Sequence, residues 1–163
     1  MSSSELIVRK ANYQDQTDGD AIVSLLDSYA KDPMGGGEVL EDEVLKNIVD
    51  ILSKYPTAFT ILAYLDNQPI GLVNCFETLS TFRAKPLVNI HDVVVIDKFR
   101  RQGIAEKMFQ AVEQEAKARG ACKLTLEVLE GNQPAKALYM KQGFKGYELD
   151  PKMGHALFWQ KEI

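Results

Sequence analysis

The chain has 163 residues, of which 45% are hydrophobic and 26% are charged, and its formal net charge is −4. These values predict one folded domain over residues 1–163, and the acidic balance argues against a nucleic-acid partner, which usually requires a basic excess. No apolar run is long enough to span a bilayer and the first residues are not a basic signal peptide, so we expect a cytoplasmic protein without membrane contact.

The first half of the chain is predicted to contain two helices and three strands. Asp18 is the expected N-cap of the first helix, because apolar residues then recur at helical spacing. Pro33 and the glycines that follow it predict a flexible loop between the two helices. The predicted elements, in order, are a strand at 6–8, a helix from 18, a helix at 41–54, and strands at 58–65 and 70–76 joined by a turn.

The second half alternates strands with helices. Gly120 and Gly143 each stand where a helix is expected to end, and Pro134 stands near the start of a short helix. The predicted elements are a strand at 87–96, a helix at 103–119, a strand at 122–128, a helix at 134–141, and closing strands at 144–149 and 156–160. The order β α α β β β α β α β β predicts an α/β domain around one central, mostly antiparallel sheet.

One junction between a strand and a helix has the residues of a phosphate-binding turn. The strand ending at Ile96 runs through a short turn into Arg100-Arg101-Gln102-Gly103-Ile104-Ala105, where the helix begins. Glycine and alanine let ligand oxygens approach the backbone, and a helix start supplies N–H donors and a partial positive charge. The alternative is a solvated basic turn ended by glycine. The turn contains neither the GxxxxGK[ST] nor the GxGxxG motif, which argues against a nucleoside triphosphate or a dinucleotide as its ligand.

At this turn the sequence resembles the GNAT superfamily of N-acetyltransferases. Arg100-x-x-Gly103-x-Ala105 matches the [RQ]-x-x-G-x-[GA] loop that binds the pyrophosphate of acetyl-CoA in that family. Asn132 to Phe144 is similar to the family's N-x-x-A-x-x-x-Y-x-x-x-G-F signature. The resemblance implies a GNAT-like fold, acetyl-CoA as co-substrate, a small-molecule amine as acceptor, and a homodimer as the form in which family members often occur. No metal is expected, because the chain has two histidines and no Cys/His cluster.

The resemblance also implies which residues form the site. The backbone of the strand segment from Val93 to Val95 would pair with the amides of the pantetheine arm, and an N–H near Val93 or Val94 would face the thioester oxygen. Tyr139 would protonate the leaving thiolate, because a phenol of pKa about 10 can supply a proton to a thiolate whose acid resembles Cys. The residues expected to bind the cofactor are Val93, Val94, Val95, Arg100, Arg101, Gln102, Gly103, Ile104, Ala105, Glu106, Asn132, Ala135, Lys136 and Tyr139.

The general base is left open between His91, Asp92 and ordered water. An imidazole titrates near pH 6.5, which suits it to take a proton from an amine. Strand alternation predicts that His91 and Asp92 point to opposite faces, so that only one of them faces the acceptor. The loop at 80–86 and the following Ile90-His91-Asp92 are similar to the diamine and thialysine acetyltransferase branch, although this chain has His91 where that branch has Glu.

Two other functions fit the same residues. One is a non-catalytic acyl-CoA-binding module with a regulatory role, and the other is an N-acetyltransferase acting on a peptide or protein amine. Retention of Tyr139 favours an enzyme, whereas the missing Glu gives slight support to the binding module.

Overall fold

The computed structural model describes residues 4–163 and divides into two compact units, one ending at Leu126 and one covering Glu127–Ile163. The strands of the first unit are β1 (Leu6–Lys10), β2 (Ala58–Leu65), β3 (Gln68–Ser80), β4 (Lys85–Val95) and β5 (Leu124–Leu126). Its helices are α1 (Gln16–Lys31), α2 (Asp42–Ser53) and α3 (Ile104–Ala118). The second unit contains α4 (Gln133–Lys141). Short 3₁₀ turns span Pro33–Gly35, Asp97–Phe99 and Pro151–Met153.

The five strands form one sheet in the order β1-β2-β3-β4-β5. All neighbours are antiparallel except β4 and β5, which are parallel and pair only from Val88↔Leu124 to Ile90↔Leu126. This mixed, mostly antiparallel sheet confirms the predicted fold class. The strand predicted at 122–128 is shorter, because the chain leaves the sheet after Leu126.

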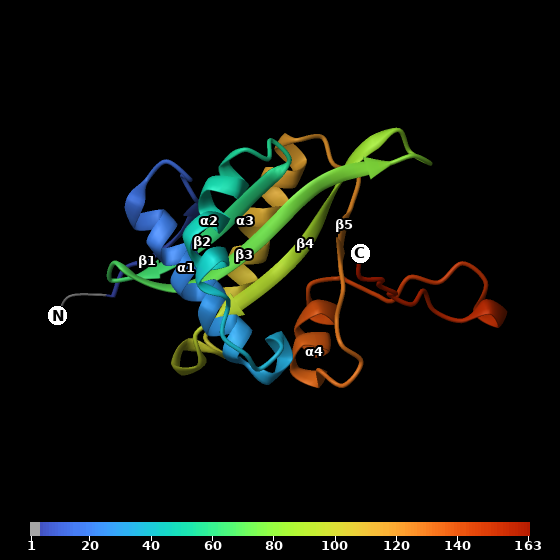
Figure 1. The fold of residues 1–163 in the computed structure, drawn as a ribbon. Coiled ribbons are helices and arrows are strands. Elements are labelled where there is room, and N and C mark those ends of the chain that lie inside the picture. Colours follow the sequence, from blue (N-terminus) through green and yellow to red (C-terminus); the bar gives the residue numbers. More distant parts are fainter. Residues whose placement is uncertain (1–3) are drawn as a thin grey trace. The chain divides into compact units, whose positions relative to one another are not determined.

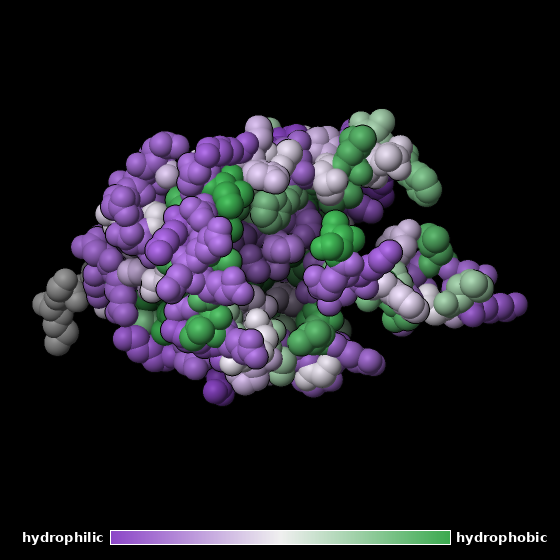
Figure 2. Space-filling view, in the orientation of Figure 1, coloured by the Kyte–Doolittle hydropathy of each residue, from purple (hydrophilic) through white to green (hydrophobic). Residues whose placement is uncertain are grey.

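Helices α1 and α2 cover one face of the sheet and α3 covers the other (Figure 1). On the face under α1 and α2, here called the α1/α2 face, a core forms from the two helices and the central strands. It includes Ile22, Leu25, Leu52, Leu62, Leu72 and Val94. On the α3 face, a Cβ on Gly71 would lie 3.0 Å from Met108, so this glycine permits close packing of α3 on β3. Figure 2 shows hydrophilic side chains over the outer surface of α1 and α2, as expected for amphipathic helices.

The prediction that Asp18 caps α1 is wrong, because the helix begins about one turn earlier. Asp15 is the N-cap and accepts a hydrogen bond from the Asp18 N–H. The carboxylate of Asp18 is instead buried, 1% exposed, and accepts bonds of 2.7 and 2.8 Å from the Arg9 guanidinium and 2.7 Å from the Tyr64 hydroxyl. It therefore joins β1, α1 and β2 at one point of the core.

The prediction of a closing pair of strands is also wrong. Residues 144–149 and 156–160 contain no strand, and a single antiparallel bridge joins Glu148 to His155. The apolar side chains on which the strand prediction depends are exposed, among them Leu149, Leu157, Phe158 and Trp159. No helix within residues 4–163 combines the length and apolar character needed to cross a bilayer.

Candidate functional site

The turn from β4 into α3 presents backbone amides at a helix start. Gly103 caps α3 with a φ of 77° and no side-chain bond, and Arg101 also has a left-handed backbone, with a φ of 62°. The Lys107 N–H donates to the Gly103 carbonyl at 3.2 Å. Amides before this bond have no acceptor within the helix, and the helix dipole adds a partial positive charge. This environment suits an anionic phosphate group.

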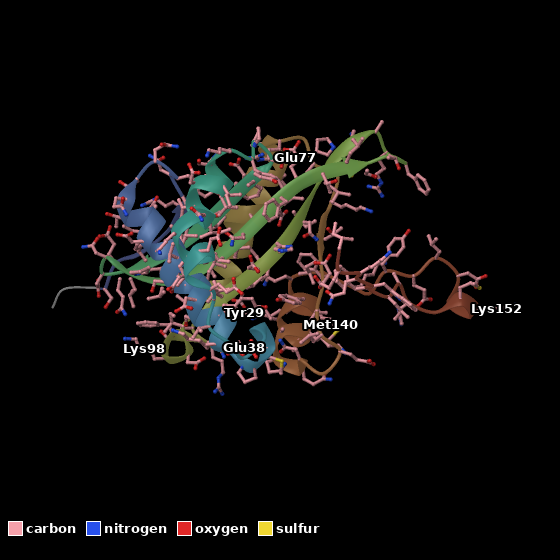
Figure 3. The ribbon with its side chains drawn as sticks, viewed as in Figure 1. Tyr29, Glu38, Glu77, Lys98, Met140 and Lys152 are labelled. Atoms are coloured by element: carbon pink, nitrogen blue, oxygen red, sulfur yellow. The ribbon has the colours of Figure 1, made fainter. Side chains whose placement is uncertain are left out.

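Arg100 holds this turn in place with its side chain. Its Nε donates to the Val95 carbonyl at 2.9 Å, and its guanidinium pairs with Asp97 at 2.8 Å and with Asp32 at 3.3 Å. The side chain therefore ties the turn to the end of β4 and to the residue that follows α1. Arg101 is exposed, as is Arg100, and Lys98 lies 4.8 Å from the centroid of the Phe99 ring (Figure 3).

Beyond Ile90, β4 keeps a neighbouring strand on only one side. The β3 pairing continues to Val95, whereas the β5 pairing stops at Ile90. The other edge of Val93–Val95 therefore has no strand from the described part of the chain beside it. Val94 packs into the core, which leaves the backbone to act. Such an edge can pair with an extended ligand that carries amides.

Asp92 lies on the α1/α2 face and is half-buried. Its Oδ2 accepts a hydrogen bond of 3.0 Å from Nδ2 of the buried Asn74, the residue paired with it on β3. Burial, and then the negative charges of Asp92 and Asp32, raise the pKa of the Tyr29 phenol on α1 (Figure 3). Burial and the same Asp92 charge also raise the pKa of the Cys75 thiol. Both groups are consequently neutral at physiological pH.

His91 lies on the same face as Asp92, and the prediction that they point apart is wrong. Asn74 pairs with Asp92 but the next residue, Cys75, pairs with Ile90, so His91 is the extra residue of a β-bulge. A bulge interrupts strand alternation. The His91 ring meets Phe76 edge-on with centroids 5.4 Å apart, and Phe76 packs against the α1/α2 core.

The second unit carries the remaining predicted site residues on α4. Asn132 is the N-cap, with its Oδ1 accepting from the Ala135 N–H at 3.2 Å. Lys136 Nζ donates to the Glu130 carbonyl at 3.3 Å. Tyr139 is half-buried, and its ring meets that of Phe144 at a centroid distance of 6.2 Å. Asn132 and Tyr139 are seven residues apart, which places them on one face of the helix.

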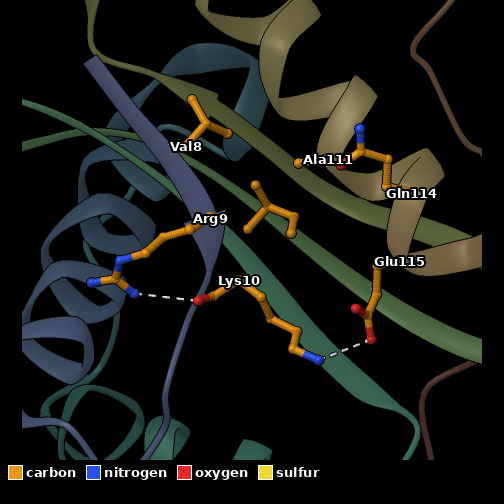
Figure 4. Close-up of a pocket in the computed structure, with 7 residues that line it drawn as sticks. Val8, Arg9, Lys10, Ala111, Gln114 and Glu115 are labelled. Carbon is orange, nitrogen blue, oxygen red and sulfur yellow. Dashed lines mark hydrogen bonds and ion pairs between the residues drawn. The ribbon is translucent and has the colours of Figure 1, made fainter. Parts of the chain in front are cut away.

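The hollows of the first unit involve none of the predicted site residues of that unit. Two shallow hollows of about 260 Å³ are lined by other side chains. The one between β1 and α3 is crossed by the 3.1 Å ion pair of Lys10 and Glu115 (Figure 4). Within residues 4–163, no three His, Cys, Asp or Glu side chains are grouped to hold a metal ion.

Sequence reasoning missed Asn74, Thr60 and Tyr29, which the structure places around or behind Asp92. Thr60 and Asn74 carry a usable signal, because each is a polar residue inside an apolar run, at 58–65 and 70–76 respectively. A buried polar side chain needs a partner, so such residues point to an interior hydrogen-bond network. Tyr29 falls on the apolar stripe of α1, and only its proximity to Asp92 distinguishes it.

Comparison with known proteins identifies the family of the chain. Residues 22–144 match the family model described as the acetyltransferase (GNAT) family. The uncharacterized N-acetyltransferase YhfO of Bacillus subtilis (strain 168) is 26% identical over 85 residues, which are 52% of this chain and 57% of that protein. The matched stretch thus spans little more than half the length of that relative.

Several solved structures share the fold. An aminoglycoside N-acetyltransferase, AAC(6')-Iy in complex with CoA, superposes with a TM-score of 0.77 at 17% identity, covering 99% of this chain and 98% of that one. A transcriptional regulator from Bacillus halodurans C-125 gives 0.78 at 19% identity, over 97% and 100% of the two chains. An aminoglycoside acetyltransferase from an uncultured soil metagenomic sample gives 0.73 at 19% identity, over 96% and 97%. With the family model spanning both sequence motifs, the chain belongs to the acetyltransferase (GNAT) family.

Proposed function

We propose that this protein transfers an acetyl group from acetyl-CoA to a primary amine of a small molecule. One observation carries the proposal: within residues 4–163, one edge of Val93–Val95 has no neighbouring strand, and the chain then leads through the turn at 96–103 into the amide-rich start of α3. Acetyl-CoA can bind both features, because the amides of its extended pantetheine arm can pair with a strand edge and its diphosphate can bind at a helix start. We further propose that both units form one catalytic domain, which the family match across Leu126 supports.

The turn would bind the diphosphate mainly through its backbone. The amides at Gly103 and Ala105, with the exposed Arg101, are the expected donors. Arg100 would act by holding the turn, because its guanidinium already has three partners within the protein. Asn132, Ala135 and Lys136 keep the cofactor-binding role that the family signature implies.

The chemistry requires a neutral amine and a proton for the leaving thiolate. A primary amine has a pKa of about 10.4 and is mostly protonated at neutral pH. We propose that Asp92 takes one proton, after which the nitrogen lone pair attacks the thioester carbon. Backbone N–H groups near Val93 and Val94 would stabilise the charge that develops on oxygen. The C–S bond then breaks, the nitrogen gives its second proton to water, and Tyr139 donates its proton to the sulfur.

Asp92 is favoured over His91 as the base because of its surroundings. Asp92 is half-buried and its Oδ2 is held by Asn74. His91 is exposed, and its ring contacts Phe76 edge-on. A half-buried carboxylate also attracts a cationic amine, which a neutral imidazole does not.

The acceptor is proposed to be a small molecule with one or two primary amines. The similarity to the diamine and thialysine branch supports this class, as do the neighbours described as aminoglycoside acetyltransferases. With His91 in place of that branch's Glu, we expect less dependence on multiple positive charges than for a polyamine. A peptide amine is the alternative acceptor.

The test is CoA release from acetyl-CoA in the presence of an amine panel of mono- and diamines, aminoglycosides and peptides. Thiol release with a small amine, at a rate that saturates with both substrates, supports the proposal. Binding of acetyl-CoA without release to any amine would instead identify a non-catalytic acyl-CoA-binding module. Sedimentation of the same sample tests the proposed homodimer, which the exposed apolar side chains of the second unit favour.

A further inference from the structure

We propose that Asn74 is a positioning residue for Asp92, and that Thr60 and Tyr13 fix the direction of the Asn74 amide. The inference rests on the proposed role of Asp92 as the base and adds three residues that support it. Thr60, Asn74 and Asp92 are register partners on β2, β3 and β4, so they form a row across the sheet. Tyr13 extends the row from the segment between β1 and α1.

The row is continuously hydrogen-bonded. Tyr13 Oη lies 2.9 Å from Thr60 Oγ1, Thr60 Oγ1 donates to Asn74 Oδ1 at 2.7 Å, and Asn74 Nδ2 donates to Asp92 Oδ2 at 3.0 Å. Thr60 is 1% exposed and Asn74 is 3% exposed, so neither can exchange these partners for bulk water. Buried polar groups of this kind are costly to leave unpaired.

The direction of every bond follows from the charge of Asp92. A carboxylate only accepts hydrogen bonds, so the amide nitrogen of Asn74 must face it. The amide oxygen then faces Thr60, whose single hydroxyl proton must point toward it. Thr60 can therefore only accept from Tyr13, and the phenol is the donor. Burial raises the pKa of Tyr13, which keeps that donor protonated at neutral pH.

Reversal of the Asn74 amide would break both of its hydrogen bonds, the one to Thr60 and the one to Asp92. A turned Asn74 would place its oxygen against the carboxylate and its nitrogen against the Thr60 proton. Thr60 and the ionised Asp92 therefore select the same orientation of the amide. With Oδ2 held by Asn74, the other carboxylate oxygen, Oδ1, is the one available to take the amine proton.

Three titratable groups lie near Asp92, two of them on elements close enough to feel its charge. These are Tyr29 on α1, Cys75 on β3 and His91 on β4 itself. Raised pKa values keep Tyr29 and Cys75 neutral over the physiological range, which leaves the imidazole of His91 to be controlled for by substitution. The pH measurements below are therefore made in both the wild-type and the His91→Gln background.

The test compares Thr60→Val, which removes one hydroxyl and keeps the shape, with Thr60→Ser, which keeps the hydroxyl. We expect Thr60→Val to lower kcat/KM for the best amine about 10-fold, mainly through kcat, since one hydrogen bond to Asn74 is lost. Its acid limb should move to higher pH, because a freed Asn74 can turn its oxygen toward a protonated Asp92. Thr60→Ser should restore both values.

The matched control is Tyr64→Phe, which removes another buried hydroxyl from the same face, bonded to Asp18 rather than to this row. It should lower stability while the pH profile stays at the wild-type position. A folded Thr60→Val variant with a wild-type pH profile would overturn the inference, and so would an equal shift in Tyr64→Phe.

A second measurement needs neither a tolerated substitution at Thr60 nor an active enzyme. In wild-type protein, the side-chain amide NMR signals of Asn74 should shift with pH as Asp92 titrates, and Asp92→Asn should remove that shift. If no amine releases CoA, the proposed function fails, but this experiment still tests whether Asn74 is hydrogen-bonded to Asp92. Asn74 signals that are the same with and without the Asp92 charge would refute it.

Discussion

The imidazole of His91 meets the ring of Phe76 edge-on, with centroids 5.4 Å apart and an interplanar angle of 89°. Phe76 packs against the core beneath α1 and α2, and Asp92 is bonded to Asn74 on that same face. One extra residue in β4 thus brings an imidazole and a carboxylate, adjacent in sequence, to one side of the sheet. The two groups can be distinguished by their effects on the pH dependence of the reaction.

Replacement of each candidate base should give different pH profiles. Asp92→Asn should lower kcat/KM for a small amine by about 10²-fold, the usual contribution of a general base, and should remove the acid inflection. His91→Ala should retain that inflection, because the carboxylate remains. Initial rates of CoA release from pH 4 to 9 measure both. An inflection at about pH 6 to 7.5 that vanishes in His91→Ala would transfer the role to the imidazole.

The bulge explains why the sequence does not reveal the directions of these side chains. Strand alternation is a property of one strand, and it fails at His91 because the register between β3 and β4 shifts there. The shift depends on pairing between two strands, which a single strand's pattern does not contain. The glycine turn before α3, in contrast, is local, so its position at a helix start is predictable from its own residues.

The errors elsewhere have similar causes. Aspartate commonly caps helices, which favours Asp18 as a cap, but the actual cap lies three residues earlier and Asp18 bonds to Arg9 and Tyr64. The segments 144–149 and 156–160 contain apolar residues typical of strands, yet a strand needs a partner, and Glu148 and His155 form a single bridge. Local signals therefore predict element types, whereas long-range contacts decide the ends and exceptions.

Substitution of Gly103 should weaken acetyl-CoA binding. Gly103 has a φ of 77°, which a β-branched residue adopts with strain, and a side chain there would cover the amides at the start of α3. Gly103→Val should raise the Kd for acetyl-CoA at least about 10-fold, as obstruction of one or two hydrogen bonds predicts. Calorimetric titration of the folded variant measures the change.

Gly120→Val is the control for backbone strain alone. Gly120 has a nearly equal φ of 74° and follows the other end of α3, where a Cβ would meet no atom within 4 Å. The variant should lose similar stability and keep wild-type affinity. Equal affinity losses in the two variants would show that strain, rather than the turn's amides, controls binding.

The buried carboxylate of Asp18 should stabilise the fold in a pH-dependent way. Burial opposes its ionisation, but hydrogen bonds from Arg9, the Asn12 N–H and Tyr64 outweigh that effect and lower its pKa from 3.8 to about 2. A lowered pKa contributes stability above the unfolded value of 3.8 that is lost as the pH falls toward 2, here about 2 kcal/mol. Asp18→Asn should therefore be less stable than wild type at pH 7, and the difference should shrink below pH 4.

Urea unfolding of Asp18→Asn at pH 7 and pH 3 measures this difference. Asp50→Asn is the matched control, because Asp50 pairs with Lys54 on the surface, where both side chains are more than half exposed. That pair should contribute less than about 1 kcal/mol at either pH. Equal destabilisation by the two substitutions, or a gap that stays constant with pH, would contradict the assignment.

Removal of the Tyr139 hydroxyl should slow the reaction while binding persists. If the phenol protonates the leaving thiolate, Tyr139→Phe should lower kcat by roughly 10²- to 10⁴-fold, with a small change in the KM for acetyl-CoA. The phenyl ring keeps the edge contact with Phe144, so α4 should remain folded. Tyr55→Phe, which changes an exposed tyrosine after α2, is the control and should leave kcat unaltered. Single-turnover measurements isolate the chemical step from product release. A wild-type single-turnover rate in Tyr139→Phe would assign the tyrosine to packing and the proton to water.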